Sequence, residues 1–200
     1  MTRHAKNVKG MLEQNELALS RELGYEALSE FVFDVVITSP LPRAIHTAFA
    51  IVTGQMALNE ERGLLAPGLW PVMPEFGSDA MFGEMTAPEG FRGRAAQVGN
   101  CTALWELHPE QKVRSWQKAM MDALEQVADN MHGDATVLHV SHSPCIELTL
   151  QGFAERNNFL LPEGAYNIKE LESVVVEFAQ EQEGEKFVIK SAKKILAPEA

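Results

Sequence analysis

Two short apolar runs, Val35–Thr38 and 136–140, constrain the fold more than any other feature of this chain. Both are rich in β-branched residues, and neither alternates apolar with polar side chains over its length. Such runs are typical of strands that are buried on both faces, as in a parallel sheet covered by helices. Each run ends in a proline-containing turn, Ser39–Pro42 after the first and Ser141–Pro144 after the second.

Helical and extended segments alternate around these two strands. Arg43–Thr53 is expected to form a helix that begins at Pro42 and ends at Gly54. Residues 102–131 carry the strongest helical spacing of apolar side chains, with a break at a proline. Residues 171–178 and 186–189 read as two further strands. The pattern predicts an α/β fold of three layers, α/β/α, with a mostly parallel sheet.

The chain has 200 residues, which suits a single domain over residues 1–200. Between about 66 and 100, glycine and proline recur among methionines and aromatic residues, which predicts an irregular excursion or lid near the functional face. A flexible insertion is the alternative. Burial of its aromatic residues favours an ordered segment; these residues are Trp70, Phe76, Phe82 and Phe91.

The net charge of -11 and the pI near 5.0 argue against nucleic acid or an anionic membrane as the main partner. A locally positive pocket for a small anion remains compatible with them.

Cys101 and Cys145 show no paired spacing, so free thiols are favoured over a disulfide. The sequence has no apolar signal segment and no run of membrane-spanning length, and a cytoplasmic location is expected. Nothing in the pattern favours one oligomeric state.

Candidate functional residues follow the predicted strands: Arg3 and His4 at the start, then Arg43 and His142. Strand carboxyl ends form the ligand crevice of an open α/β sheet, so these side chains are expected to meet there. Arginine forks fit a phosphoryl group, and a neutral histidine can attack phosphorus. The alternatives are a surface Arg43 in a first helical turn and a structural His142. A metal site would need clustered ligands, and no metal or other cofactor is predicted.

Taken together, these stretches resemble the histidine phosphatase superfamily, the phosphoglycerate mutase-like group. The resemblance is carried by four segments in order: Arg3-His4-Ala5, Ser39–Ala48, Val140-Ser141-His142 and Leu161–Ala165. It implies that His4 is the nucleophile and forms a phosphohistidine. It also implies that Arg3, Arg43 and His142 hold the phosphoryl oxygens, and that water then hydrolyses the intermediate.

The chain departs from the family's pattern where many members carry an acidic residue. At the matching place, Leu64–Pro67, it has Ala66 and no carboxylate. This segment, together with His142-Ser143-Pro144, resembles the phosphohistidine phosphatases of the SixA type, which lack that acid. Glu75 and Glu84 in the excursion are weak candidates for a general acid.

A second departure lies at the first strand, because only Met1 and Thr2 precede Arg3. The strand is expected to be truncated, through a late start of the chain or a hole in the sheet. The function expected is that of a phosphatase, a phosphoric monoester hydrolase that acts through His4. Its substrate would be a small phosphomonoester or a phosphorylated protein side chain. The alternative is a catalytically weak or inactive relative that binds a phosphorylated ligand.

Overall fold

A computed structural model describes residues 1–6, 12–62, 71–131, 134–179 and 187–198 of the protein. A five-stranded sheet of strand order β2-β3-β1-β4-β5 lies at its centre. The strands are β1 (Thr2–Arg3), β2 (Val35–Thr38), β3 (Val137–Ser141), β4 (Ser173–Ala179) and β5 (Val188–Ile195). The two runs that dominate the sequence pattern are therefore neighbouring strands.

The sheet is mixed, which corrects the expectation of a mostly parallel one. β2, β3 and β1 run parallel to one another, whereas β4 is antiparallel to β1 and β5 is antiparallel to β4. The chain between Ala179 and Val188 is shorter than the roughly dozen residues that a parallel crossover needs, so β4 and β5 form a hairpin.

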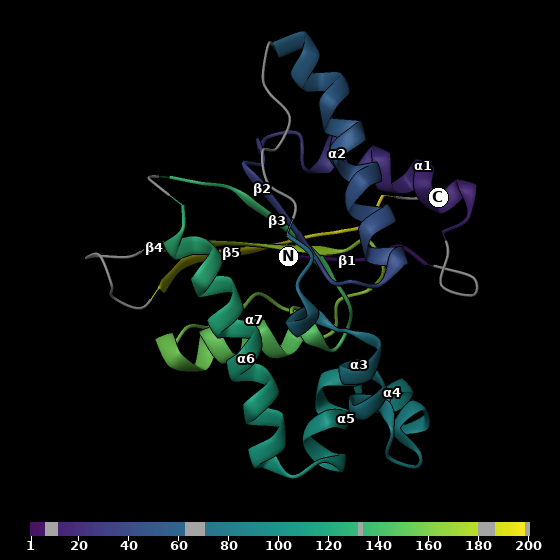
Figure 1. Ribbon diagram of the computed structural model, residues 1–200, viewed down its shortest axis with the longest axis vertical. Helices are drawn as coiled ribbons and strands as arrows, with labels where there is room; N and C mark the ends of the chain where they lie inside the picture. The colour runs from purple at the N-terminus through teal and green to yellow at the C-terminus, as the bar shows by residue number, and fades with distance from the viewer. Residues whose placement is uncertain (7–11, 63–70, 132–133, 180–186, 199–200) are drawn as a thin grey trace.

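Helices cover both faces of the sheet, as expected (Figure 1). On one face, α1 (Gln14–Glu22), the π-helical turn η1 (Leu23–Ala27) and α2 (Pro42–Arg62) pack against β2 and β3. On the other face lie α6 (Glu110–Asp129) and α7 (Cys145–Asn157). Cys101 and Cys145 are buried free thiols. Within the described ranges, no helix is both long and apolar enough to cross a membrane.

Gly54 does not end α2, contrary to the sequence-based expectation. A Cβ atom on Gly54 would lie 2.0 Å from the backbone oxygen of Arg21, and one on Gly24 would lie 2.0 Å from that of Ile51. Real Cβ atoms do not approach backbone so closely, so both glycines allow α1 and η1 to cross tightly over α2. The glycine inside α2 reflects this packing and not a helix cap.

The described part of the excursion is helical. It forms the short 3₁₀ turn η2 (Pro74–Phe76), α3 (Asp79–Thr86), α4 (Phe91–Val98) and α5 (Asn100–Leu107), which gather beside α6 (Figure 1). Phe76 and Phe91 are buried in a core shared with α6, and Phe82 is half-buried. Trp70 lies outside the described residues.

The first strand, β1, is two residues long and sits in the middle of the sheet. Thr2 and Arg3 lie opposite Val140 and Ser141 of β3, and Thr2 also lies opposite Ser173 of β4. Beyond this short contact, the facing edges of β3 and β4 border a cavity of about 880 Å³. The strand nevertheless delivers Arg3 and His4 to the end of the sheet where β2 and β3 also finish.

Candidate active site

Three parallel strands deliver the candidate residues to one edge of the sheet. β1 leads directly into His4, β2 leads through a turn into Arg43 on α2, and β3 leads directly into His142. Arg3 lies opposite Ser141, and Thr38 lies opposite Val140, so the three strands end nearly level. The structure therefore brings the predicted residues together.

The His4 ring is buried and held in one tautomer. Its Nδ1 lies 2.6 Å from the backbone oxygen of Ala5, and Arg43 Nε donates a hydrogen bond to its Nε2 over 3.3 Å. Since a guanidinium can only donate, Nε2 is the acceptor and Nδ1 carries the proton. Burial lowers the pKa of His4 to about 3, helped by the charges of Arg43 and Arg3 and opposed by the bond to Ala5. His4 is thus neutral near pH 7, with a lone pair on Nε2.

Helix α2 positions both Arg43 and the backbone next to His4. Thr47, one turn after Arg43, donates a hydrogen bond to the Arg43 backbone oxygen (2.8 Å) and accepts one from the Ala5 N–H (3.0 Å). Burial lowers the pKa of Arg43, while the nearby Asp79 carboxylate opposes this shift. Arginine stays protonated in proteins, so Arg43 faces His4 as a cation.

The His142 ring lies beside His4, with ring centroids 4.7 Å apart. Its Nε2 and Ser39 Oγ are 2.5 Å apart in a hydrogen bond, and its buried Nδ1 has no partner among the described residues. Burial lowers the pKa of His142 to about 2, with further lowering by His4 and the two arginines. Both histidines are therefore uncharged, and the positive charge of the cluster comes from arginine.

Gly77 closes over His142 from the excursion. Its φ of +107° lies in the region that favours glycine, and a Cβ there would lie 2.9 Å from His142 Cδ2. Ser141 Oγ, in turn, donates to the backbone oxygen of Phe76, which fixes the loop against β3. The excursion is thus attached to the catalytic edge by direct contact.

Arg3 lies at the cluster but is also engaged elsewhere. It donates from Nη1 to the Ile168 backbone oxygen (2.8 Å) and from Nη2 to Glu170 Oε1 (2.9 Å). Its buried Nε has no partner in the described part of the chain. The Arg3 charge nevertheless contributes to the lowered pKa values of His4 and His142. The Nε–H is therefore a buried donor of Arg3 that no acceptor of the described residues occupies.

The structure narrows the choice of a catalytic carboxylate. Glu84 forms an ion pair with Lys112, whose hydrogen bond lowers the pKa of Glu84, whereas Glu75 and Asp79 are both exposed. Ala66 lies outside the described residues. Asp79, the first residue of α3, is the carboxylate that acts electrostatically on Arg43. Sequence reasoning missed Asp79; its only signal was the helix start after Gly77-Ser78, where Ser78 caps α3.

Two further polar residues have contacts near the cluster that were not predicted from the sequence. Ser39 bonds His142, as described above, and Glu147 is buried on α7 with Oε1 accepting from the Ile168 N–H. Burial raises the pKa of Glu147 to about 7, and the nearby Ser143 side chain and the Arg3 charge oppose this shift. Across the ranges that the structure covers, no group of three or more His, Cys, Asp or Glu side chains is placed to hold a metal ion.

Comparison with known proteins gives a family match and several similar folds. Residues 12–185 match the histidine phosphatase superfamily (branch 1). Bacillus stearothermophilus YhfR is similar in structure (TM-score 0.58, 16% identity, 94% of this chain and 93% of the other). A mycobacterial glucosyl-3-phosphoglycerate phosphatase in complex with VO3 has a TM-score of 0.55 (13% identity, 95% of each chain). A Bacillus anthracis phosphoglycerate mutase has a TM-score of 0.50 (17% identity, 80% of each chain). No curated protein matches the sequence.

Proposed function

Because this chain belongs to the histidine phosphatase superfamily, we propose that it hydrolyses phosphomonoesters through a covalent phosphohistidine on His4. The observation that carries the proposal is the neutral His4 ring, whose Nε2 lone pair meets the Arg43 guanidinium beside His142. The family match begins at residue 12 and leaves Arg3 and His4 outside it. The role of His4 therefore rests on its geometry in the site and on the Arg3-His4-Ala5 resemblance.

The proposed reaction begins when the His4 Nε2 lone pair attacks phosphorus in line with the ester oxygen. The new N–P bond forms as the P–O bond to the leaving group breaks, and an acid protonates the departing oxygen. Arg43 and Arg3 supply donors to the phosphoryl oxygens, where charge accumulates in the transition state. The Arg43 Nε bond to His4 is long at 3.3 Å, so the phosphoryl group can replace it as acceptor.

In the second step water attacks the phosphohistidine, the N–P bond breaks, and the electron pair returns to His4 Nε2. The proton of the attacking water leaves to a base, and inorganic phosphate is released. The acid that serves the first step can serve as this base, since it is then deprotonated. His142 lies close enough to His4 to hold a phosphoryl oxygen once its Nε2 hydrogen bond with Ser39 is exchanged.

We propose a small phosphomonoester or a phosphorylated protein side chain as substrate, with neither nucleic acid nor membrane as a partner, in the cytoplasm. Similar structures include the glucosyl-3-phosphoglycerate phosphatase above and an alpha-ribazole phosphatase from Shigella flexneri, which supports the small-molecule choice. The likeness to the SixA type, carried by Leu64–Pro67 and His142-Ser143-Pro144, supports the phosphoprotein choice.

A second candidate function is binding of a phosphorylated ligand with little or no turnover. The Arg3–Glu170 ion pair favours it, because the Glu170 carboxylate already accepts a hydrogen bond from the Arg3 guanidinium, which catalysis would use to hold the phosphoryl group. Such a protein would bind phosphate or vanadate and leave phosphomonoesters intact. Turnover of an aryl phosphate separates the two functions.

The test is to trap the intermediate on the purified protein. Labelled aryl phosphate is added, and the reaction is quenched in base, which preserves phosphohistidine. We expect acid-labile, base-stable label on the wild type and on His46→Gln, a control on α2, but not on His4→Ala. Turnover in His4→Ala should fall about a thousandfold or more. Equal turnover in His4→Ala and wild type would sink the proposal.

A further inference from the structure

A pocket formed by the excursion opens beside the catalytic cluster. It encloses about 400 Å³ and is lined by residues of α3, α4 and the start of α5. Two of its residues, Phe82 and Asn100, join it to the cluster. The Phe82 ring lies 5.9 Å from the His142 ring and 5.8 Å from Arg43 Cζ, and Asn100 Nδ2 donates to Ser143 Oγ over 2.7 Å. A group leaving from phosphorus at His4 therefore has this pocket as its neighbour.

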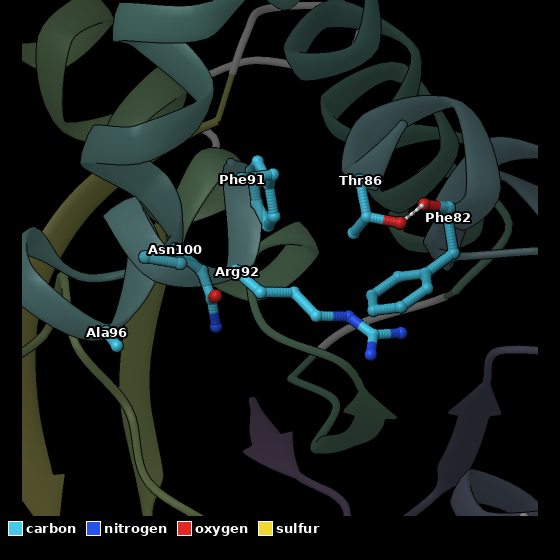
Figure 2. Close-up of a pocket in the computed structure, with 7 residues that line it drawn as sticks. Phe82, Thr86, Phe91, Arg92, Ala96 and Asn100 are labelled. Atoms are coloured by element: carbon cyan, nitrogen blue, oxygen red, sulfur yellow. Dashed lines mark hydrogen bonds between the residues drawn. The ribbon is translucent and has the colours of Figure 1, made fainter. Parts of the chain in front are cut away.

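The interior of the pocket is largely apolar. The rings of Phe82 and Phe91 and the methyl groups of Ala95 and Ala96 line it. Thr86 Oγ1 donates to the backbone oxygen of Phe82 within the same helix, so this hydroxyl is already engaged (Figure 2). The volume lies near the lower end of the range for small-molecule sites. Its volume and lining suit a small apolar group.

The one charged side chain of the lining is Arg92. Its side chain is exposed and extends from α4 along the pocket (Figure 2). In the part of the chain that the structure describes, Arg92 forms no ion pair, whereas Arg94 on the same helix is paired with Glu106. An arginine that faces a pocket without a carboxylate partner favours an anion, most strongly through paired hydrogen bonds to a carboxylate.

We propose that this pocket binds the leaving group of the substrate, and that Arg92 selects leaving groups that carry a carboxylate on an apolar or aromatic body. The inference rests on the proposed function, since the phosphoryl group must sit at His4 for the rest of the ester to reach the pocket. Phe82 belongs to both parts of the site, because its ring lies near His142 and Arg43 and also lines the pocket with Arg92.

The experiment compares 4-carboxyphenyl phosphate with 4-carbamoylphenyl phosphate, which has nearly the same shape but no charge. We expect the wild type to prefer the carboxylate about tenfold in kcat/KM, as one charge-assisted contact provides. Arg92→Gln should lose this preference, and the matched control Arg94→Gln should keep it. A preference that is absent in the wild type, or that survives in Arg92→Gln, would overturn the assignment.

Binding of non-hydrolysable analogues separates this inference from the proposed function. Calorimetry with 4-carboxyphenylphosphonate and phenylphosphonate reports the carboxylate contact without turnover. Suppose that no ester is hydrolysed, but that 4-carboxyphenylphosphonate binds about tenfold tighter than phenylphosphonate and Arg92→Gln removes this difference. The proposed function is then wrong, and the pocket assignment is kept. If esters are hydrolysed and the two analogues bind equally, the pocket assignment fails alone. If neither analogue binds at millimolar concentration, the pocket assignment also fails.

Discussion

In the proposed reaction, Arg43 connects the nucleophile His4 with the phosphoryl group that is transferred. It sits near the start of α2, half-buried, with Nε directed at His4 and its guanidinium over the Phe82 ring. A phosphoryl group at His4 would meet a planar fork of donors and not a point charge. The rigid fork sets both the position and the charge of the site.

Arg43→Lys should therefore be costly although it keeps the positive charge. We expect kcat/KM for aryl phosphates to fall about a hundredfold, the scale of one lost transition-state donor. The melting temperature should change little, because Arg43 is only partly buried. Arg94→Lys, at a surface ion pair, is the control and should keep full activity. If Arg43→Lys has the kinetics of the wild type, Arg43 is only a surface residue in the first turn of α2 and has no role in the reaction.

Asp79 is the carboxylate that we predict to protonate the leaving group. Its charge acts on Arg43, whereas Glu84 is held by Lys112 on the side of α6. A general acid matters most when the leaving oxygen is strongly basic. Asp79→Asn should thus slow hydrolysis of an alkyl phosphate about tenfold or more and leave 4-nitrophenyl phosphate nearly unchanged.

The controls for Asp79 are Glu75→Gln and Glu84→Gln, measured with the same two substrates. If one of these controls loses activity on the alkyl ester alone, and Asp79→Asn does not, the glutamate changed in that control is the general acid. Equal losses on both esters in Asp79→Asn would indicate an effect on Arg43 and not on protonation.

The sequence located Arg43 and His142 because each follows a predicted strand, and parallel strands bring their ends together. His4 was located through the Arg3-His4-Ala5 resemblance, since no full strand could be predicted before it. The sequence could not locate Asp79, Phe82 or Arg92 in the same way. Asp79 and Phe82 reach the cluster, and Arg92 reaches the neighbouring pocket, through a helical excursion whose path depends on packing against α6. No local spacing encodes that path.

At the level of elements, the loop around Gly77 joins the excursion to the catalytic edge. It runs from η2 into α3, passes over His142, and is fixed to β3 by the Ser141 hydroxyl. The position of α3, and with it Asp79 and Phe82, depends on this crossing. Space for a side chain is absent there, since a Cβ would also lie 3.3 Å from Cys145 Sγ.

Gly77→Ala should displace both the loop and His142. The φ of +107° disfavours alanine, and the added methyl group meets the His142 ring. We expect activity to fall at least about tenfold and the melting temperature to drop by several degrees, the effect of roughly 1–3 kcal/mol. Activity and thermal melting are measured together.

Gly83→Ala is the matched control, because a Cβ at Gly83, inside α3, meets nothing within 4 Å. Alanine is the better helix former there, so this variant should be as stable as the wild type or slightly more so. Full activity in Gly77→Ala would show that His142 tolerates displacement, and the loop would not position the site.

Two predictions about the elements were wrong: the role of the glycine in α2, and the direction of the last two strands. The glycine in α2 looked like a cap but serves a close helix crossing, which depends on the partner helix α1. The β4–β5 hairpin followed from the short connection, yet the parallel character of β2 and β3 was extended to the whole sheet. The strands and the helices at 42 and 110 were recognisable because their patterns are local.

At the level of the whole molecule, three buried histidines tie stability to pH. Burial lowers the pKa values of His4 and His139 to about 3 and that of His142 to about 2. The folded state therefore binds fewer protons than the unfolded state below pH 6.5, so stability is full above that pH and falls toward pH 3. The raised pKa of Glu147, about 7, acts in the opposite direction between pH 4.5 and 7.

His139 offers a test of this pH dependence away from the catalytic edge. Its ring contacts Phe76, and neither ring nitrogen has a partner among the described residues. His139→Leu should reduce the loss of unfolding free energy between pH 6.5 and 5 by about 2 kcal/mol, the linkage of one histidine. Denaturant unfolding at several pH values measures it. An unchanged slope in His139→Leu would contradict a buried neutral His139.

The last prediction concerns the middle of the sheet. In the described chain, Val137–His139 of β3 pair with β2 only, and 175–179 of β4 pair with β5 only. Met1 exchanges backbone hydrogen bonds with Val174, so the direction of β1 already points along the space between β3 and β4. The cavity of about 880 Å³ lies there, lined by both strands. Because β3 and β4 both pair with β1, the distance between them there leaves room for one strand.

A designed extension of about five apolar, β-branched residues before Met1, a usual strand length, should fill this space. It would pair its backbone with β3 and β4 and cover apolar side chains on both faces, as a central strand does. We expect the melting temperature to rise by about 5 °C or more and hydrogen exchange to slow at Val137–His139. An extension of equal length made of glycine and serine is the control and should change neither. Equal melting temperatures for the two extensions would show that β3 and β4 accept no strand between them. The two residues of β1 would then hold His4 as firmly as a longer strand would.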